Sequence, residues 1–354
     1  MNNNVLLGMS GGVDSSVAAI LLKKQGYNVI GITMKLFEQE MEGSCCNLSS
    51  TNDAKSVCDF LNIPHYTLNF KEKFKKYVIN DFIKCYANCK TPNPCIECNK
   101  YLKFGEMWKK ARELDCDYIA TGHYAKTKYS EEYKRWVLKK SNNLKKDQSY
   151  VLWNIPQELI EHIIFPLAEY DDKAKIREIA QENSLKVANK PDSEDICFIP
   201  DGNYRSFLEK NSEIKQAKGN IVNSHGEVLG HHVGLYNYTI GQRKGLGISN
   251  PVPLFVLGFN KEKNEVIVGE EKELYKKEII VTDINLLLTD EINEWMEVTV
   301  KTRYSSKVAS AKIIQEDKGT IKVIFEEPQR AITPGQSAVF YKDDIVVGGG
   351  KIKC

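Results

Sequence analysis

The sequence predicts an α/β protein: a parallel-sheet domain followed by two small, mainly antiparallel β domains. Two observations lead to this fold class. In the first half of the chain, apolar runs of strand length alternate with amphipathic segments of helix length, an order typical of parallel sheets with helices on both faces. After about residue 205 this alternation stops, and short β-type segments recur at near-regular spacing, as in small barrels.

Length and composition agree with a multidomain protein of the cytoplasm. The chain has 354 residues, of which 42% are hydrophobic and 27% charged, as in soluble globular proteins. No apolar run has membrane-spanning length, and the first four residues lack the features of a signal peptide. Ten cysteines without a secretory signal indicate thiol or metal chemistry rather than a disulfide framework. A net charge of +2 does not itself indicate nucleic-acid binding, so such a partner would use local patches.

The first strand-to-helix connection has the composition of a phosphate-binding loop. A short apolar run over 5–7 leads into the segment Gly8-Met9-Ser10-Gly11-Gly12-Val13-Asp14-Ser15, and an amphipathic segment follows. Glycines allow a sharp turn and a close backbone approach, and the free N–H groups of a helix start bind anions. The lysine-bearing phosphate loop and the Gly-x-Gly-x-x-Gly pattern are both absent. An ordinary glycine-rich turn is the alternative interpretation.

The elements that follow keep the alternation. We expect strands over 29–33, 65–68 and 117–121. One helix is expected to start from a cap at Ser50 or Thr51, and two further helices are expected to cover 70–85 and 99–114. Ligands of open parallel sheets bind beyond the carboxyl ends of the strands. The loop after the first strand, Met34 and Gly122-His123 are therefore expected to line one pocket.

The β-rich part is expected to form two domains. We place the boundaries near residues 207 and 277, which gives domains 1–207, 208–276 and 277–354. The expected strands cover 221–222, 228–229, 255–259, 265–268, 279–282, 296–302, 308–314, 320–325, 337–341 and 345–347.

Two segments contain cysteines in settings of chemical interest. In Thr91–Cys98 two prolines keep the chain extended, and Cys98 is expected near the first turn of the helix over 99–114. The positive end of a helix lowers the pKa of a thiol at such a position. The segment 190–199 places Cys197 between apolar residues just after three acids, and composition alone favours a buried structural role for this cysteine.

Taken in order, these motifs resemble those of the tRNA-specific 2-thiouridylases, members of the N-type ATP pyrophosphatase superfamily. The matching segments are 10–15, 91–99, 122–124, 146–150, 196–199, 241–247 and 303–304. The resemblance covers the whole chain. It implies an ATP-pyrophosphatase catalytic domain that thiolates the wobble uridine of tRNA at C2, splitting ATP into AMP and pyrophosphate.

The resemblance also implies roles for individual residues. ATP would be bound by Gly8, Met9, Ser10, Gly11, Gly12, Val13, Asp14, Ser15, Met34 and Gly122. The target base would meet Asn93, Pro94 and Cys95, and tRNA would be contacted by His123, Lys146, Asp147, Gln148, Arg303, Tyr304 and Gln336. Cys98 would be the nucleophile and Cys197 would carry a persulfide, so that the two thiols end as a disulfide.

Cofactors and partners follow from the same resemblance. Mg²⁺ would accompany ATP, with Asp14 as the only carboxylate of the loop to help hold it. The partners would be tRNA and a cysteine desulfurase or sulfur-relay protein as sulfur donor. Without the resemblance, the lysines at 139, 140, 145 and 146 would be interpreted as a solvated charged face.

One position departs from the commonest family pattern. Many members carry Asn-Pro-Asp-x-x-Cys, whose aspartate is a candidate acid or base, whereas this chain has Cys95 there. Cys95 has three open interpretations: a reactive thiolate, a thiol that resolves oxidised Cys98, or a residue without a role. A fourth is that Cys95, Cys98 and Cys197 are ligands of an iron–sulfur cluster.

Two other functional classes remain as alternatives. The first is an ATP pyrophosphatase that adenylates a small molecule. The second is a tRNA-binding protein without catalysis, in which Cys85, Cys89, Cys95 and Cys98 form a structural zinc knot.

Overall fold

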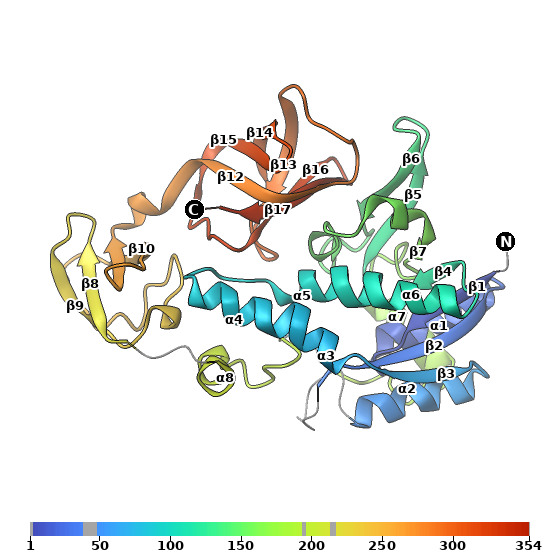
Figure 1. The fold of residues 1–354 in the computed structure, drawn as a ribbon. Helices are drawn as coiled ribbons and strands as arrows, with labels where there is room; N and C mark the ends of the chain where they lie inside the picture. Colours follow the sequence, from blue (N-terminus) through green and yellow to red (C-terminus); the bar gives the residue numbers. More distant parts are fainter. Residues whose placement is uncertain (1–2, 38–47, 193–195, 213–216, 354) are drawn as a thin grey trace.

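The predicted fold class is confirmed by the computed structural model, which describes residues 3–37, 48–192, 196–212 and 217–353 (Figure 1). A five-stranded parallel sheet forms the first part of the chain, in the order β3-β2-β1-β4-β7. Its strands are β1 (Asn4–Gly8), β2 (Asn28–Lys35), β3 (His65–Asn69), β4 (Tyr118–Ala120) and β7 (Ile163–Ile164). The strand order reverses at β1, so the loop after β1 lies at the switch point where such sheets bind ligands.

Helices cover both faces of this sheet because its central strands are buried on both sides. Val5 and Leu7 pack against α1 (Val13–Lys24), α2 (Leu48–Phe60) and α7 (Lys173–Glu182). Leu6 points to the opposite face and packs against α6 (Met107–Glu113). The alternation along β1 therefore divides the core into two layers.

The start of α2 corrects one expectation. The helix already includes Leu48, so Ser50 and Thr51 lie inside it and neither caps it.

The helix expected over 70–85 is present with an irregular middle. It consists of α3 (Lys71–Phe74), the π-helical turn η1 (Lys75–Ile79) and α4 (Asn80–Ala87). Nothing in the apolar spacing of this segment distinguishes a π-helical turn from an α-helical one, since the two differ by one residue per turn.

The helix expected over 99–114 begins earlier than the sequence predicts. Its first turn is α5 (Pro94–Glu97), which continues through the π-helical η2 (Cys98–Glu106) into α6. The side chain of Asn93 caps it by accepting a hydrogen bond of 3.2 Å from the N–H of Cys95. Pro94 stands at the first helical position, where its missing N–H costs nothing. Cys98 lies near the first turn, as expected, but the earlier start of the helix places Cys95 within that turn and Cys98 directly after it.

The central β domain has its own small core. Its sheet has the order β10-β11-β8-β9, from β8 (Gly219–Asn223), β9 (Val228–His232), β10 (Phe255–Asn260) and β11 (Glu265–Gly269). The β11–β8 pair is parallel and the other two pairs are antiparallel. Apolar side chains of these strands and the following loops form the core: Ile221, Tyr238, Leu246, Val256, Val266 and Val268. Helix α8 (Tyr204–Asn211) precedes this domain.

The C-terminal strands close into an antiparallel barrel. They are β12 (Tyr275–Leu286), β13 (Met296–Lys301), β14 (Ala309–Asp317), β15 (Thr320–Arg330), β16 (Ser337–Lys342) and β17 (Ile345–Ile352). The barrel closes because β12 pairs with both β15 and β17.

A hairpin from the first half of the chain extends the barrel sheet. Strands β5 (Ala125–Ser130) and β6 (Arg135–Lys140) were not expected from the sequence, and β6 pairs with β17 through Lys139 and Ile345. The two parts also share one hydrophobic core. Trp153 and Tyr150 are fully buried in a cluster that includes Val339, Tyr341 and Val346 of the barrel. The barrel is therefore packed into the first domain rather than tethered to it.

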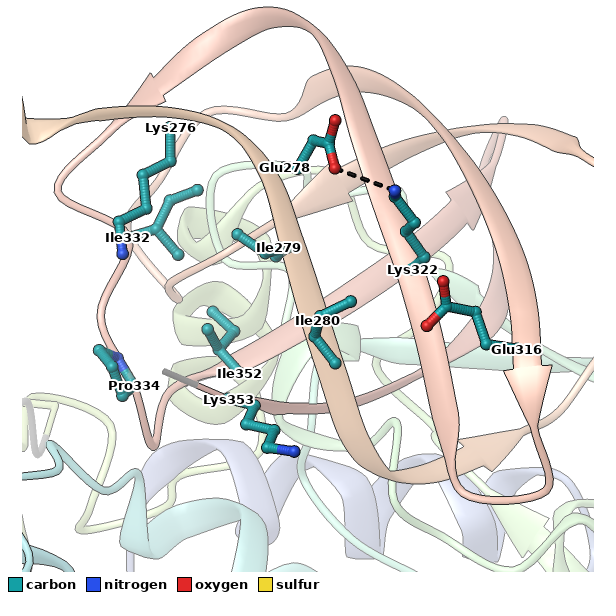
Figure 2. A pocket seen from close by; sticks show the side chains of 10 residues that line it. All are labelled: Lys276, Glu278, Ile279, Ile280, Glu316, Lys322, Ile332, Pro334, Ile352 and Lys353. Atoms are coloured by element: carbon teal, nitrogen blue, oxygen red, sulfur yellow. Dashed lines mark ion pairs between the residues drawn. The ribbon is translucent and has the colours of Figure 1, made fainter.

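A pocket on the barrel contains none of the predicted site residues (Figure 2). Apolar side chains such as Ile279 and Ile352 lie beside charged ones, and Glu278 pairs with Lys322 at 3.0 Å. Within the described part of the chain, every helix is too short or too polar to span a bilayer.

Candidate functional site

The loop between β1 and α1 is shaped by close backbone contacts. Gly11 has a φ of +70°, and a Cβ atom at this position would lie 2.1 Å from the carbonyl oxygen of Ser50. A Cβ atom on Gly122 would lie 2.8 Å from the backbone nitrogen of Ser15. Gly122 follows β4, the strand next to β1. The structure therefore brings the two predicted glycine segments together at the carboxyl ends of neighbouring strands.

The start of α1 presents backbone N–H groups toward this loop. The residue before the helix is Gly12, and no described side chain caps the helix there. The Ser15 hydroxyl accepts a hydrogen bond of 3.2 Å from the N–H of Ser10, and the Ser16 hydroxyl donates one of 2.8 Å to the Gly12 carbonyl. Without a side-chain cap, the first amides of a helix are available to an anion.

A network of charged groups surrounds the same loop. The ammonium of Lys173 lies 2.6 and 2.7 Å from the two carboxylate oxygens of Asp14 and 3.0 Å from Asp192. The Tyr124 hydroxyl donates a hydrogen bond of 2.8 Å to Asp14. Burial and the Asp14 carboxylate raise the pKa of Tyr124, so it stays protonated as a donor. Lys190 reaches the Gly11 carbonyl at 3.1 Å.

Lys173 and Lys190 were not predicted as site residues. Lys173 is the first residue of α7, and it faces Asp14 from 159 positions away in the chain. The sequence gives no local motif at either lysine. The only available signal is the position of Lys173 at the start of the helix that follows the last parallel strand.

Met34 lies near the carboxyl end of β2, as the sequence predicts. It packs against both the core of the sheet and an apolar cluster that contains Cys98 and Cys197. Met34 therefore lies between the layer under the loop and the cysteines.

His123 is a buried, uncharged residue. Its Nδ1 lies 2.7 Å from the Thr121 hydroxyl, and its Nε2 lies 3.4 Å from the ammonium of Lys103. Burial, and then the Lys103 charge, hold the pKa of His123 well below its usual range. The predicted tRNA residue is thus placed in the protein interior.

Residues 146–148 hold the turn around Tyr124 in place. Gln148 accepts a hydrogen bond of 2.9 Å from the Tyr124 N–H and returns one of 2.8 Å to the Tyr124 carbonyl. Asp147 accepts hydrogen bonds from Ser141 and Ser149, and burial raises the pKa of its carboxyl. Lys146 pairs with Asp192 at 3.1 Å. Each predicted tRNA residue in this segment therefore has partners within the chain.

Two of the predicted tRNA residues in the barrel bind backbone carbonyls. Arg303 donates to the carbonyls of Ile240 at 3.3 Å and Ala331 at 2.9 Å, and also to the Thr333 hydroxyl. Burial lowers the pKa of Arg303. Because Ile240 belongs to the central part of the chain, Arg303 joins that part to the barrel.

Gln336 makes a comparable link to the first domain. Its amide donates hydrogen bonds to the carbonyls of Thr91 at 2.9 Å and Pro92 at 3.2 Å. Tyr304 differs from both residues, since its side chain is exposed beside Tyr150, with ring centroids 6.0 Å apart. Burial raises the pKa of Tyr304, and the nearby Asp147 and Cys95 add to this shift.

The structure places Cys98 and Cys197 in one apolar cluster. Cys98 is 8% exposed and belongs to a core that includes Phe82, Leu102 and Phe198, against which Cys197 packs. Cys95 lies one turn before Cys98 and is exposed. Two of the three acids that precede Cys197 in the sequence, Glu194 and Asp195, lie outside the described residues. Cys98 and Cys197 lie in one region, as expected if both take part in one reaction. The Cys95 side chain, in contrast, is exposed.

The cysteines in the described part of the chain do not form a metal-ligand set. Among the described residues, no group of three or more His, Cys, Asp or Glu side chains is arranged to hold a metal ion. Neither the cluster ligands Cys95, Cys98 and Cys197 nor the zinc knot around Cys85 is therefore assembled. Cys95 is exposed, whereas Cys98 is buried in the apolar cluster.

A magnesium ion would find a single carboxylate at the loop, that of Asp14. Mg²⁺ is commonly held by one or two carboxylates together with substrate phosphates, so Asp14 fits such an ion when a nucleotide supplies the other ligands. The Lys173 ammonium occupies both oxygens of Asp14 in this structure and would have to move.

Family models match the three parts of the chain. Residues 3–201 match a model described as a tRNA methyl transferase HUP domain. Residues 205–270 match a tRNA methyl transferase PRC-barrel domain, and residues 276–352 match an aminomethyltransferase beta-barrel domain.

Among solved structures, the U34-tRNA thiolase NcsA from Methanococcus maripaludis with its 4Fe-4S cluster is similar in part of its fold. It is 20% identical with a TM-score of 0.35, and the match covers 60% of this chain and 68% of that chain. A likeness of this extent says nothing about cofactors.

Two relatives that match this chain over its full length carry the same name. A protein of Clostridioides difficile named tRNA-specific 2-thiouridylase MnmA is 50% identical over 357 residues, covering 100% of this chain and 99% of that protein. A protein of the same name from Clostridium beijerinckii is 51% identical over 358 residues, with 100% and 99% covered. With half of its residues identical over the full length, this chain belongs to the tRNA-specific 2-thiouridylase family.

Proposed function

We propose that this protein carries out the ATP-dependent 2-thiolation of the wobble uridine of tRNA. The observation that carries the proposal is the match, over the full length and at 50% identity, to relatives named for tRNA 2-thiolation. Two features of the structure support it. The loop at the switch point of the sheet leads into a helix without a side-chain cap, and two cysteines from distant segments share one apolar cluster.

ATP is proposed to bind at the loop after β1. The residues assigned to it are Gly8, Met9, Ser10, Gly11, Gly12, Val13, Asp14, Ser15, Met34 and Gly122. Free amides at the start of α1, with Lys173 and Lys190 nearby, are suited to stabilise charge that develops on the departing pyrophosphate. Mg²⁺, when bound to the nucleotide, neutralises phosphate charge, and Asp14 is the residue that would hold it.

The proposed reaction has two stages. In the first, the C2 oxygen of the uracil attacks the α-phosphorus of ATP, and pyrophosphate leaves. The oxygen then departs as part of AMP when sulfur adds to C2. The target base is assigned to Asn93, Pro94 and Cys95, which lie on the same helix start as Cys98.

Sulfur transfer is proposed to use both cysteines. The terminal sulfur of a persulfide on Cys197 bonds to C2 and displaces AMP. The thiolate of Cys98 then attacks the inner sulfur of Cys197, so that 2-thiouridine leaves and a Cys98–Cys197 disulfide forms. An external thiol reduces this disulfide before the next turnover, and a cysteine desulfurase or sulfur-relay protein reloads Cys197. Reducing conditions of this kind place the reaction in the cytoplasm.

The two β domains are proposed to dock tRNA. We divide the chain into a catalytic domain over 1–207, a central domain over 208–276 and a barrel over 277–354. The residues assigned to tRNA are His123, Lys146, Asp147, Gln148, Arg303, Tyr304 and Gln336. Of these, Tyr304 is exposed next to the Cys95 helix and is best placed for a direct contact.

The test is a thiolation reaction with α-labelled ATP, unmodified tRNA and a persulfide donor. We expect 2-thiouridine by mass analysis of the nucleosides and AMP as the labelled product, with tRNA stimulating AMP formation. ADP as the main product would contradict the proposal. AMP formation that ignores tRNA would favour the adenylation of a small molecule instead.

Cysteine variants complete the test. Cys98→Ser and Cys197→Ser should each abolish thiolation. Cys116→Ser is the matched control, because Cys116 is buried away from the loop and burial raises its pKa to about 11. A zinc-knot protein without catalysis would give no 2-thiouridine with any variant.

A further inference from the structure

The barrel forms hydrogen bonds with the segment that precedes the Cys98 helix. The N–H of Thr91 donates a hydrogen bond of 2.9 Å to the carbonyl of Pro334, and Gln336 donates to the carbonyls of Thr91 and Pro92. These contacts fix the extended entry to the helix. The helix that follows is held by its buried side chains and by Asn99, whose amide donates a hydrogen bond of 2.9 Å to the Val151 carbonyl, and a second attachment from the barrel reaches the helix itself.

Lys351 of β17 provides that second attachment. Its ammonium lies 2.9 Å from a carboxylate oxygen of Glu97 and 3.9 Å from Asp81. Glu97 is 6% exposed and immediately precedes Cys98 in the chain. Burial alone would lower the pKa of Lys351, but Glu97 and Asp81 raise it to about 12, so the lysine stays charged. Strand β17 thereby holds the helix one residue before the proposed nucleophile.

The placement of this pair argues for more than stability. A buried ion pair adds little net stability compared with apolar side chains of similar volume, because both charges must be desolvated. It does fix the distance and direction between two elements, since the charges are costly to separate. Here the two elements are the barrel and the turn that contains Cys98.

We infer that the Lys351–Glu97 ion pair is a positioning device that sets the orientation of Cys98 for sulfur transfer. Lys351 and Glu97 act through the helix and do not touch the reacting atoms, so they are positioning residues rather than catalytic ones. The inference rests on the proposed function. It adds that the barrel positions the proposed nucleophile as well as docking tRNA.

The deciding variant removes both charges from the full-length protein. In Lys351→Met/Glu97→Gln the buried side chain at position 97 carries no unpaired charge, and Asp81, which also loses its contact with Lys351, is partly exposed to solvent. We therefore expect a melting temperature and a tRNA affinity close to those of the wild type. The single-turnover rate of thiolation should fall by about tenfold or more, because a misplacement of about 1 Å costs that much or more. Lys351→Arg keeps the charge and should restore most of the rate. A wild-type rate in the double variant would overturn the inference.

A second readout does not depend on thiolation. Alkylation by iodoacetamide, resolved by peptide mass analysis, should modify Cys98 several-fold faster in the double variant, relative to exposed Cys95. If the wild type makes no 2-thiouridine, the proposed function fails, yet this ratio still reports whether the pair holds Cys98. An unchanged ratio would overturn the inference independently.

Two further variants serve as a control and as a replacement for the double variant. Lys322→Met removes the charge of a barrel ion pair with Glu278 that lies away from the first domain, and it should leave both readouts unchanged (Figure 2). If the double variant melts far below the wild type, Lys351→Gln takes its place, because the amide still donates to Glu97. The same loss of rate and the same rise in the alkylation ratio are expected there, and their absence would contradict the inference.

Discussion

Lys173 binds both oxygens of the Asp14 carboxylate at the edge of the phosphate loop. An ammonium in this position can turn to the phosphates of an incoming nucleotide. Lys173→Met should weaken ATP binding by about tenfold to a hundredfold, since a hydrogen bond to a charged group contributes about 1.5–3 kcal/mol. Titration calorimetry with ATP measures this. Lys175→Met is the matched control, because Lys175 lies on the same helix and pairs with Asp171 at the surface. Equal ATP affinity in both variants would exclude Lys173 from the site.

The buried imidazole of His123 makes folding stability depend on pH. Its folded-state pKa lies well below the usual 6.5, so the unfolded chain takes up the proton first. The contribution to stability is therefore complete above pH 6.5 and is lost as the pH falls below that value, by about 1.4 kcal/mol per pH unit. Burial lowers the pKa of His65 as well, which adds to the slope.

Urea unfolding across this pH range tests the effect. The wild type should lose stability between about pH 6.5 and pH 5, and His123→Asn should lose distinctly less over the same range. Parallel slopes in the two proteins would show that His123 titrates normally in the folded state.

Arg303 and Tyr304 are neighbours in the chain with different surroundings. Arg303→Ala removes hydrogen bonds to Ile240 and Ala331, so it should lower the free energy of unfolding by about 1.5–3 kcal/mol. Tyr304→Ala removes an exposed ring and should leave stability unchanged. We expect it to weaken tRNA binding by about 1–3 kcal/mol if a base stacks there.

Thermal unfolding and a tRNA titration over a salt series separate these two roles. A phosphate contact by Arg303 would flatten the salt dependence in Arg303→Ala, because fewer counterions would be released. An unchanged salt slope would assign Arg303 to the junction of the two β parts alone.

At the scale of elements, the conformation of the turn between β1 and α1 depends more on Gly11 than on Gly12. Gly11→Ala would force a Cβ atom against the backbone of Ser50 at a left-handed φ, so it should abolish ATP binding and lower the melting temperature. Gly12→Ala is the control, since a Cβ atom there meets only the Ser10 hydroxyl at 3.4 Å. ATP binding by Gly11→Ala at wild-type affinity would show that the loop adapts by moving α2.

Local patterns predict most of the elements, and they fail where a partner lies far away in sequence. Apolar runs locate β1 and β2 because burial on both faces leaves a continuous apolar signal. The hairpin β5–β6 escapes such reasoning, since it joins strand β17, about 200 residues later. The start of α5 differs from the prediction for another reason: the two prolines favour an extended chain, yet proline is also favourable at the first helical position, which Pro94 occupies.

The same distinction applies to the site. The turn between β1 and α1 is predictable because its glycines are required by local backbone contacts. The partners of Gln336 are not, because the carbonyls of Thr91 and Pro92 are 245 and 244 positions away. No pattern within a single segment shows that an amide side chain will meet another backbone rather than solvent.

At the scale of the molecule, the barrel and the first part of the chain share a core. The central domain has a cluster of its own, although Tyr236 and Phe255 also pack against the other parts. Trp153 is fully buried in the shared core. Trp153→Ala should cost about 3–5 kcal/mol and should lower the stability of both parts together. Hydrogen exchange resolved by segment measures this: residues 337–352 should lose protection along with β1 and β4. Val266→Ala, in the central core, should affect only residues 219–269.

Exchange in the barrel that stays at the wild-type level in Trp153→Ala would contradict a single cooperative unit. It would mean that the barrel folds alone and that the shared cluster forms only after docking.

The pairing of β17 with β6 has a consequence for how the protein is made. Ribosomes release the chain from its N-terminus, so Cys98 emerges long before Ser337–Ile352, the strands that complete its surroundings. Until those strands have been synthesised, Trp153 and Tyr150 belong to an incomplete core. During that interval Lys351 has not yet met Glu97, and the proposed nucleophile has no fixed direction. If translation stops within the sequence of the barrel, the released polypeptide therefore contains both proposed reactive thiols but lacks the Lys351–Glu97 ion pair that orients Cys98.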